Sequence, residues 1–160
     1  MKKSILIIFL VLIIDQALKL WIKTNMELRD SIEILSWFKI YFTENPGMAF
    51  GLEYGGNYGK LALSIFRVFA ISGLIYWLRS LIKSKASGVA IVSVSLITAG
   101  AIGNMIDSAF YGLIFDKGML FNEELMAWTG YHGLAQYSTE GYSAFLRGNV
   151  VDMLYFPMYE

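Results

Sequence analysis

The chain has 160 residues, of which 56% are hydrophobic and 16% are charged, whereas soluble domains average about 45–50% apolar and about 25% charged residues. Lys plus Arg equals Asp plus Glu at 13 each, so no bulk positive field favours nucleic acid as a partner. Cysteine is absent and His132 is the one histidine, which argues against thiolate catalysis, disulfides and Cys- or His-based metal clusters. These numbers indicate a small integral membrane protein whose chemistry rests on carboxylates, amides and backbone groups.

Three stretches are long and apolar enough to compare with the roughly 20 residues that cross a bilayer. They cover residues 4–22, 61–82 and 88–107. The first follows two lysines, as a secretory signal does, but no small-x-small cleavage site ends its apolar run, so we expect an uncleaved span. The sequence therefore predicts an all-α membrane protein in which residues 1–160 form one domain, a transmembrane helix bundle.

The distribution of lysine and arginine predicts how the spans are oriented. Two lysines precede the first span and three basic residues crowd residues 79–87, so we place the N-terminus and this link in the cytoplasm. Residues 23–60 and the chain after Asp107 then lie on the outer side. Residues 31–42 are β-prone and amphipathic, which predicts a strand or hairpin on the outer surface. Residues 109–147 mix Gly, Tyr and polar residues and indicate an extramembrane insertion with little regular structure.

Ionisable residues within a span are costly, so we interpret them as functional or at least partnered. Asp15 and Lys19 are four residues apart in the first span, which is the spacing of an ion pair on one helix face, and this pair could equally be structural. Arg67 lies near the outer end of the second span, where its side chain is expected to snorkel to the outer headgroups.

The end of the third span combines small and polar residues. Ala99 and Gly103 have the small-xxx-small spacing that lets another helix approach closely. Asn104 and Asp107 are three residues apart and share a face, so an amide and a carboxylate project together where the bilayer meets water. A polar cluster without chemistry has the same pattern, but the helix dipole opposes a carboxylate at this end, which favours a functional role.

Two further segments offer candidate site residues. The turn sequence Asn45-Pro46-Gly47 forms either a plain loop or a turn that presents Asn45 and backbone amides to a ligand. Asp152 is an acid inside an apolar run. Burial raises the pKa of a carboxyl group, and such an acid can hold or give a proton near neutral pH, as general acid–base catalysis requires.

Four motifs occur in a recognisable order along the chain. They are Asp15-Gln16-x-x-Lys19, Asn45-x-Gly47-x-Ala49-Phe50-Gly51, Gly103-Asn104-x-x-Asp107 and Val150-Val151-Asp152. Together they resemble the motifs of the lipoprotein signal peptidases, also called signal peptidase II, which are membrane aspartyl proteases. The match covers essentially the whole chain, in the family's order and with the topology derived from charge.

The resemblance implies an aspartic-type endopeptidase that cuts the signal peptide from a prolipoprotein whose Cys carries a diacylglyceryl group. It places the enzyme in the bacterial cytoplasmic membrane, as a multi-pass monomer in contact with membrane lipids, with its site on the outer, periplasmic side. It implies two catalytic aspartates without a metal or other cofactor, and Asp152 matches the first of them. The positions that match substrate-pocket residues are Asp15, Lys19, Asn45, Gly47, Asn104 and Asp107.

The chain departs from the family pattern at three places. Ser108 follows the third motif where an arginine is typical, and residues 109–147 form an insertion that could act as a lid. The second catalytic aspartate, in a Phe-Asn-x-Ala-Asp motif that opens a fourth span, is absent from residues 1–160. We therefore expect a C-terminally truncated, inactive member with three spans. The alternative is a non-catalytic three-span membrane protein that binds lipid or a partner helix.

Overall fold

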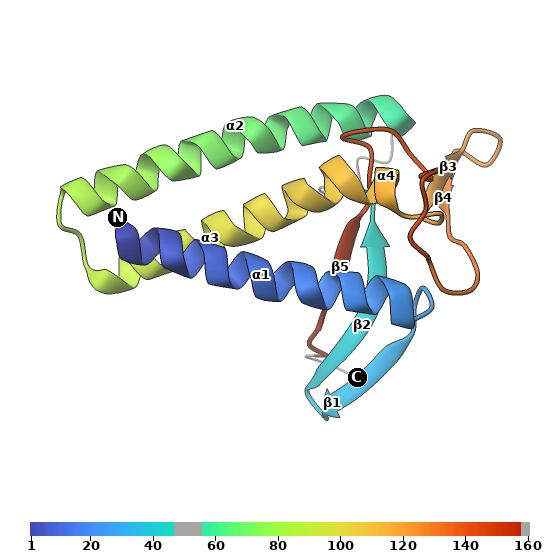
Figure 1. Ribbon diagram of the computed structural model, residues 1–160, viewed down its shortest axis with the longest axis horizontal. Coiled ribbons are helices and arrows are strands. Elements are labelled where there is room, and N and C mark those ends of the chain that lie inside the picture. The colour runs from blue at the N-terminus through green and yellow to red at the C-terminus, as the bar shows by residue number, and fades with distance from the viewer. Residues whose placement is uncertain (47–55, 158–160) are drawn as a thin grey trace.

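The computed structural model describes residues 1–46 and 56–157, and the body of the described protein is a bundle of three long helices (Figure 1). They are α1 (Lys2–Asn25), α2 (Gly56–Lys83) and α3 (Gly88–Ile106). α3 packs against both α1 and α2. In the most apolar windows of α1 and α2, 11% of the residues are buried, because most of the large apolar side chains point outward. Helices whose solvent is lipid have this character, and each is long and apolar enough to cross a membrane.

The third helical segment extends beyond the end that its sequence predicts. Its path continues past Asp107 through a π-helical turn, η1 (Asp107–Tyr111), into α4 (Gly112–Ile114). The expected end rested on a change in composition, but Tyr111 and Phe115 are buried and continue the apolar pattern beyond that point. A π-helical turn holds one extra residue and re-aims the side chains around it, which is why such turns occur often at functional sites.

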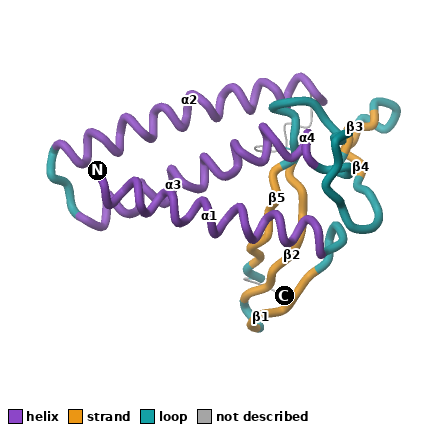
Figure 2. The backbone as a smooth tube through the Cα atoms, in the orientation of Figure 1, coloured by secondary structure: helices purple, strands orange, loops and turns teal. Residues whose placement is uncertain are grey.

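A three-stranded antiparallel sheet extends from one end of the bundle (Figure 2). It consists of β1 (Ser31–Leu35), β2 (Phe38–Asn45) and β5 (Val150–Tyr155), in the order β1-β2-β5. The first two strands form the hairpin that the sequence predicts. β5 comes from the far end of the chain and pairs with β2, which places Val150 opposite Asn45. The predicted fold class, a membrane helix bundle with a small β part, is confirmed.

The stretch between α4 and β5 folds back onto the end of the bundle. It contains a two-stranded hairpin, β3 (Leu120–Asn122) and β4 (Ala127–Thr129), which the sequence did not indicate. The backbone N–H of Ser143 donates to the carbonyl oxygen of Gly112 over 2.9 Å. This stretch therefore lies beside α4 and the start of α2 (Figure 1).

The main apolar cluster lies where α1, the sheet and η1 meet. Its buried members come from α1 and the residue that follows it, from β2, η1 and β5, and from the segments that follow α4: Ile22, Met26, Phe42, Tyr111, Phe115, Ala135 and Val151. Full burial of a large apolar side chain contributes about 1.5–3 kcal/mol. The spanning helices turn most of their large apolar side chains outward, so apolar burial is concentrated at the sheet end. Val151 of β5 belongs to this cluster, which therefore holds β5 against the bundle.

Gly148 lies where the chain leading into β5 contacts the π-helical turn. Its backbone N–H donates to the carbonyl oxygen of Ser108 over 2.8 Å. A Cβ atom at this position would lie 2.4 Å from the backbone oxygen of Asp107 and 2.8 Å from the backbone nitrogen of Gly112. Both are backbone atoms that cannot turn aside, so the contact requires glycine.

We expect Gly148→Ala to lower the free energy of unfolding by about 2 kcal/mol, because β5 must move away from η1. Gly100→Ala is the matched control, since nothing lies within 4 Å of a Cβ atom built there, and alanine is favoured over glycine inside a helix by about 1 kcal/mol. The measurement is thermal unfolding of each purified variant in detergent micelles. Equal melting temperatures for the two variants would contradict the close approach.

Candidate active site

A buried lysine joins α1 to α3 at the sheet end of the bundle. Lys19 Nζ lies 2.7 Å from Asp107 Oδ2 and donates to Asn104 Oδ1 over 2.9 Å. Asp15 Oδ2 lies 3.4 Å from the same nitrogen. Lys19 is 3% exposed and Asp107 is 0% exposed. The Asp15–Lys19 pair expected from the sequence is therefore present. The same ammonium group also binds Asn104 of α3 and Asp107 of η1.

Gln16 completes this cluster. Its Nε2 donates to Asp107 Oδ1 over 2.9 Å and to Asp15 Oδ2 over 3.1 Å. The Tyr111 hydroxyl donates to Gln16 Oε1 over 3.3 Å. Gln16 was not among the predicted site residues, although its three-residue spacing from Lys19 puts both on one helix face. Tyr111 carried no sequence signal, because the π-helical turn that brings it here was not predicted.

Gly103 makes the close contact between α1 and α3 possible. A Cβ atom built on it would lie 2.5 Å from Asp15 Oδ2. Ala99, one turn earlier, is 1% exposed. The small-xxx-small spacing therefore does what the sequence predicts, because it lets a second helix bring its carboxylate against the α3 backbone.

Asp107 also fixes the strand that carries Asp152. The backbone N–H of Val151 donates to Asp107 Oδ2 over 3.2 Å. Gln16 and Lys19 bind the same carboxylate from α1. Since a buried charge is stable only when it is paired and hydrogen-bonded, this carboxylate holds α1, η1 and β5 in one arrangement.

Asp152 is exposed, and the expectation that it is buried is wrong. Side chains alternate along a strand, so Val151 points into the apolar cluster and the next residue points out of it. The surrounding protein still desolvates the carboxyl group enough to raise the pKa of Asp152 above its ordinary value. A hydrogen bond from the Asn45 side chain and the positive charges of Lys19 and Arg67 oppose that rise.

The predicted turn after β2 is described in part. Asn45 is the last residue of β2, and its side chain is in place beside Asp152. Gly47 lies outside the described residues. The structure therefore brings Asp15, Lys19, Asn45, Asn104, Asp107 and Asp152 to one end of the bundle.

Arg67 has a buried partner inside the protein, whereas the sequence led us to expect that its side chain snorkels to the outer headgroups. Its Nη1 donates to Ser108 Oγ over 2.6 Å, and Ser108 is 2% exposed. The hydroxyl gives the guanidinium a partner inside the bundle, which removes the reason to reach for the headgroups. Ser108 occupies the position where the family pattern typically has arginine, and the cation comes here from α2 instead.

A second buried ion pair, which no sequence motif indicated, lies beside the first cluster. Lys23 forms an ion pair with Glu44. Lys23 is 0% exposed and Glu44 is 4% exposed. Glu44 Oε1 also accepts from the Tyr131 hydroxyl over 2.8 Å, and Oε2 accepts from Asn149 Nδ2 over 2.7 Å. Burial raises the pKa of Tyr131, so its hydroxyl stays a neutral donor. The four-residue spacing from Lys19 to Lys23 is the only local hint of this pair.

The arrangement favours proton transfer at one carboxyl group. Asp152 is exposed, has an amide partner and lies near fixed positive charges, which is the environment of a carboxyl group that works as an acid or base. Within residues 1–46 and 56–157, no group of three His, Cys, Asp or Glu side chains is placed to hold a metal ion.

Comparison with known proteins relates the chain to one family. The sequence profile of the family described as signal peptidase (SPase) II matches residues 7–160. A lipoprotein signal peptidase of Porphyromonas gingivalis is 46% identical over 158 residues, which is 96% of this chain and 63% of that protein. A lipoprotein signal peptidase of Amoebophilus asiaticus is 37% identical over 157 residues, 96% of this chain and 58% of that protein. The chain thus spans about three fifths of the length of these curated relatives.

The fold is also similar to a solved structure. A bacterial membrane enzyme superposes with a TM-score of 0.60 and 26% sequence identity, over 99% of this chain and 72% of that one. Similarity in sequence and similarity in fold therefore indicate the same kind of protein.

We expect Lys19→Met to lower the free energy of unfolding by about 3–5 kcal/mol, because it leaves the buried Asp107 carboxylate without its cation. Adding Asp107→Asn should recover part of this loss, since the unpaired charge is then gone. Lys39→Met is the control, because Lys39 pairs with Glu33 over 3.3 Å at the surface and such pairs contribute about 0–1 kcal/mol. Denaturant unfolding in micelles measures all three. A cost for Lys19→Met as small as that for Lys39→Met would contradict the role of the buried pair.

Proposed function

The chain belongs to the signal peptidase II family, and from this premise we propose that it is an aspartic-type endopeptidase acting on prolipoproteins. The bond cut is the one that joins the signal peptide to a Cys carrying a diacylglyceryl group. Family membership confirms the resemblance carried by the four motifs. The single observation that supports the activity most is the placement of Asp152, an exposed carboxyl group with a raised pKa, against the polar cluster of α1 and α3.

In the proposed reaction, a water molecule attacks the scissile carbonyl carbon while a pair of carboxyl groups shares one proton. The ionised carboxylate takes a proton from the water, and the protonated carboxyl gives its proton to the leaving amine. Asp152 supplies one of these groups. Its raised pKa suits it to either role, and Asn45 orients it by a hydrogen bond.

Asp107 is not suited to be the second acid of this pair. It is 0% exposed, and its two oxygens accept from Gln16, Lys19 and the backbone of Val151. Both oxygens already have protein donors and neither is exposed, so water and substrate do not reach this carboxyl group. We therefore give Asp107 a structural role, and the second catalytic aspartate is the one that the family resemblance places in a Phe-Asn-x-Ala-Asp motif.

The membrane setting suits a lipid-modified substrate. The candidate site lies at the sheet end of the bundle, and the link 79–87, with its three basic residues, lies at the opposite end (Figure 1). Basic links stay in the cytoplasm, which supports a site on the outer, periplasmic side of the bacterial cytoplasmic membrane. Each buried CH₂ of an acyl chain contributes about 0.8 kcal/mol to membrane binding, so a diacylglyceryl group holds the scissile bond at this depth. Membrane lipids are the other contacts we propose, and a monomer suffices for the reaction.

Asp152→Asn tests the proposal. In protein produced from its native gene and reconstituted in lipid, we expect it to reduce cleavage of a diacylglyceryl-modified precursor by at least about 10³-fold, because the amide cannot exchange a proton with water or amine. Asp116→Asn is the matched control, since Asp116 is exposed and accepts from the Gln136 backbone, which an asparagine oxygen can also do. Cleavage is followed by mass spectrometry of the released signal peptide.

A precursor whose Cys is unmodified serves as the substrate control and should be cut poorly by every variant. Undiminished cleavage of the lipidated precursor by Asp152→Asn would remove the catalytic assignment. The non-catalytic three-span membrane protein, which binds lipid or a partner helix, would then be the better interpretation.

A further inference from the structure

The last part of the stretch between α4 and β5 lies along η1 and α4. The backbone N–H of Ser143 donates to the carbonyl oxygen of Gly112 over 2.9 Å. Five residues later, the backbone N–H of Gly148 donates to the carbonyl oxygen of Ser108 over 2.8 Å. Residues 143–148 therefore run beside the end of the third helical segment, in the opposite direction to it.

Residues 144–147 form a tight turn in the middle of this path. The backbone N–H of Arg147 donates to the carbonyl oxygen of Ala144 over 3.0 Å, and Leu146 inside the turn has a φ of 64°. Leucine rarely adopts this left-handed conformation, which persists only where the surroundings fix it. The Ser64 hydroxyl of α2 supplies one such contact, because it donates to the carbonyl oxygen of Leu146 over 2.9 Å.

The turn is held by side chains that belong to membrane-spanning segments. Ser64 lies within the candidate span Tyr58–Lys83, six residues from its start, which is about 9 Å along a helix. The ring of Phe145 meets the ring of Phe110 edge-on, with 5.9 Å between their centroids, and Phe110 lies within the candidate span Gly88–Ile114. The turn therefore lies beside residues at spanning depth.

The two rings form an open apolar surface. Phe145 is 53% exposed and Phe110 is 48% exposed. Leu113, three residues after Phe110, is 40% exposed. Phe110 and Leu113 belong to the outward-facing apolar side chains of the third candidate span, so Phe145 extends a surface that lipid covers.

The charge pattern of the stretch separates this turn from the residues before it. Residues 141–146 carry no charge. Charged side chains occur before them, at Asp116, Lys117, Glu123, Glu124 and Glu140. Because a charged side chain in a bilayer is costly, the uncharged part can enter the membrane while the charged part stays in water.

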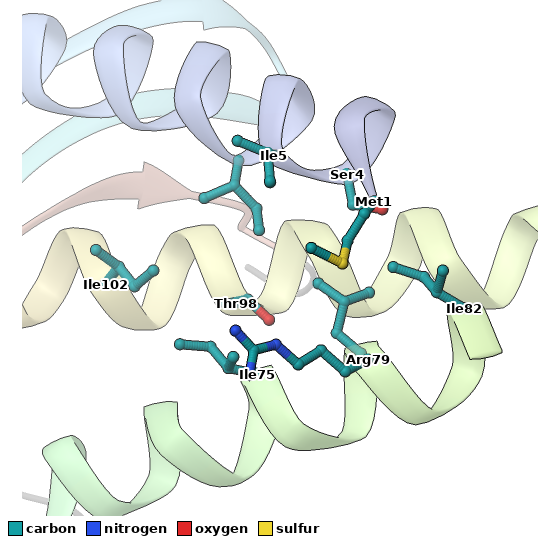
Figure 3. A pocket seen from close by; sticks show the side chains of 10 residues that line it. Met1, Ser4, Ile5, Ile75, Arg79, Ile82, Thr98 and Ile102 are labelled. Carbon is teal, nitrogen blue, oxygen red and sulfur yellow. The ribbon is translucent and has the colours of Figure 1, made fainter.

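The apolar side chains at the opposite end of the bundle are arranged differently. Ile5, Ile75 and Ile102 line a cavity of about 200 Å³ between α1, α2 and α3, and Arg79 reaches into the same space (Figure 3). An acyl chain would have to enter between helices there and lie against a cation. At Phe145 the surface is open and uncharged, which suits acyl chains better.

We propose that the turn 144–147 lies within the membrane leaflet at the sheet end of the bundle, where Phe145 and Phe110 contact lipid acyl chains. The charge pattern of the spans makes this the outer leaflet. The sequence places all of residues 109–147 outside the membrane, so the proposal differs from that expectation at this turn. Since β5 begins three residues after the turn, the lipid contact holds the approach to β5 at the depth of the bilayer.

Nitroxide labelling measures the depth of the turn. Residues 1–160 contain no cysteine, so Phe145→Cys gives one labelled position in the full chain from the native gene, after any cysteine outside these residues is replaced by serine. The protein is reconstituted in vesicles of phosphatidylethanolamine and phosphatidylglycerol. Oxygen concentrates in the bilayer, whereas a polar nickel chelate stays in water, so the ratio of their collision rates with the label, read by EPR power saturation, reports depth.

Two equally exposed positions serve as matched controls. Phe66→Cys on α2 is the lipid control and Leu125→Cys, at the tip of the hairpin of β3 and β4, is the water control, with wild-type exposures of 65% and 67%. We expect the oxygen-to-nickel ratio at residue 145 to be at least about fivefold that at residue 125 and within about twofold of that at residue 66. A ratio equal to that at residue 125 places the turn in water, and low collision rates with both reagents place it under protein. Either result overturns the proposal.

A second pair of variants tests whether the Phe145 ring holds the turn in the leaflet. The label is placed at Ala144→Cys, since Ala144 is exposed in the same turn. We expect Phe145→Glu to lower the oxygen-to-nickel ratio there by at least about threefold, because a carboxylate in hydrocarbon is costly, and Phe145→Leu to leave it unchanged. Equal ratios in the two variants would contradict the role of the ring. If Phe145→Cys is not recovered folded, Ala144→Cys alone reports the depth against the same two controls.

This inference goes beyond the proposed function and does not require it. The EPR signal reports where the turn lies and does not depend on turnover. A wild-type protein that fails to cleave the lipidated precursor would refute the proposed function and leave the depth of the turn standing. A turn found in water would overturn this inference and leave the cleavage result standing.

Discussion

The arrangement of this protein depends on one buried ammonium group. Lys19 is 3% exposed inside a bundle whose outer surface is made for lipid, and there a charge is tolerated only with close partners. Asp107 is the nearest partner at 2.7 Å. Gly103 leaves room on α3 for the Asp15 carboxylate, which a Cβ atom at this position would meet at 2.5 Å. Since Asp107 also accepts from the Val151 backbone, satisfying the lysine places β5 at the same time, and Asp152 follows by the alternation of the strand.

β5 is fixed from two directions by consecutive lysines on one face of α1. Lys19 acts through Asp107 on Val151, and Lys23, one helical turn later, acts through Glu44 on Asn149. A buried ion pair gives little net stability, but loss of one partner is costly, so such pairs select one arrangement over its alternatives. Two such pairs, one helical turn apart on α1, hold β5 at Val151 and the residue before the strand, Asn149.

The sequence predicts those parts that depend on local pattern. Apolar length predicted the three helices, and the β-prone, amphipathic pattern predicted the hairpin of β1 and β2. Spacing predicted the Asp15–Lys19 pair, and the family resemblance assigned Asp107 to the same site. What it missed depends on contacts between distant segments. The sequence around Glu44 is that of an ordinary strand, and its hydrogen bond with Asn149 is seen only in the fold. Arg67 has the sequence position of a snorkelling residue, and its bond to Ser108 inside the bundle is likewise seen only in the fold. The π-helical turn η1 contacts β5, and no local sequence pattern records a contact between such distant segments.

The acids around β5 are distinguished by what neutralises them. Asp15 and Asp107 share the Lys19 ammonium, and Glu44 is paired with Lys23 and a tyrosine hydroxyl. Asp152 differs, because among the described residues its hydrogen-bond partner is the amide of Asn45 and its cations act from further away. The Asp107 and Glu44 carboxyl groups are buried against their lysines, whereas Asp152 is exposed and has an amide as its hydrogen-bond partner. Asp15, Asp107 and Glu44 thus hold the helices and β5 together through their contacts, and Asp152 stays accessible for chemistry.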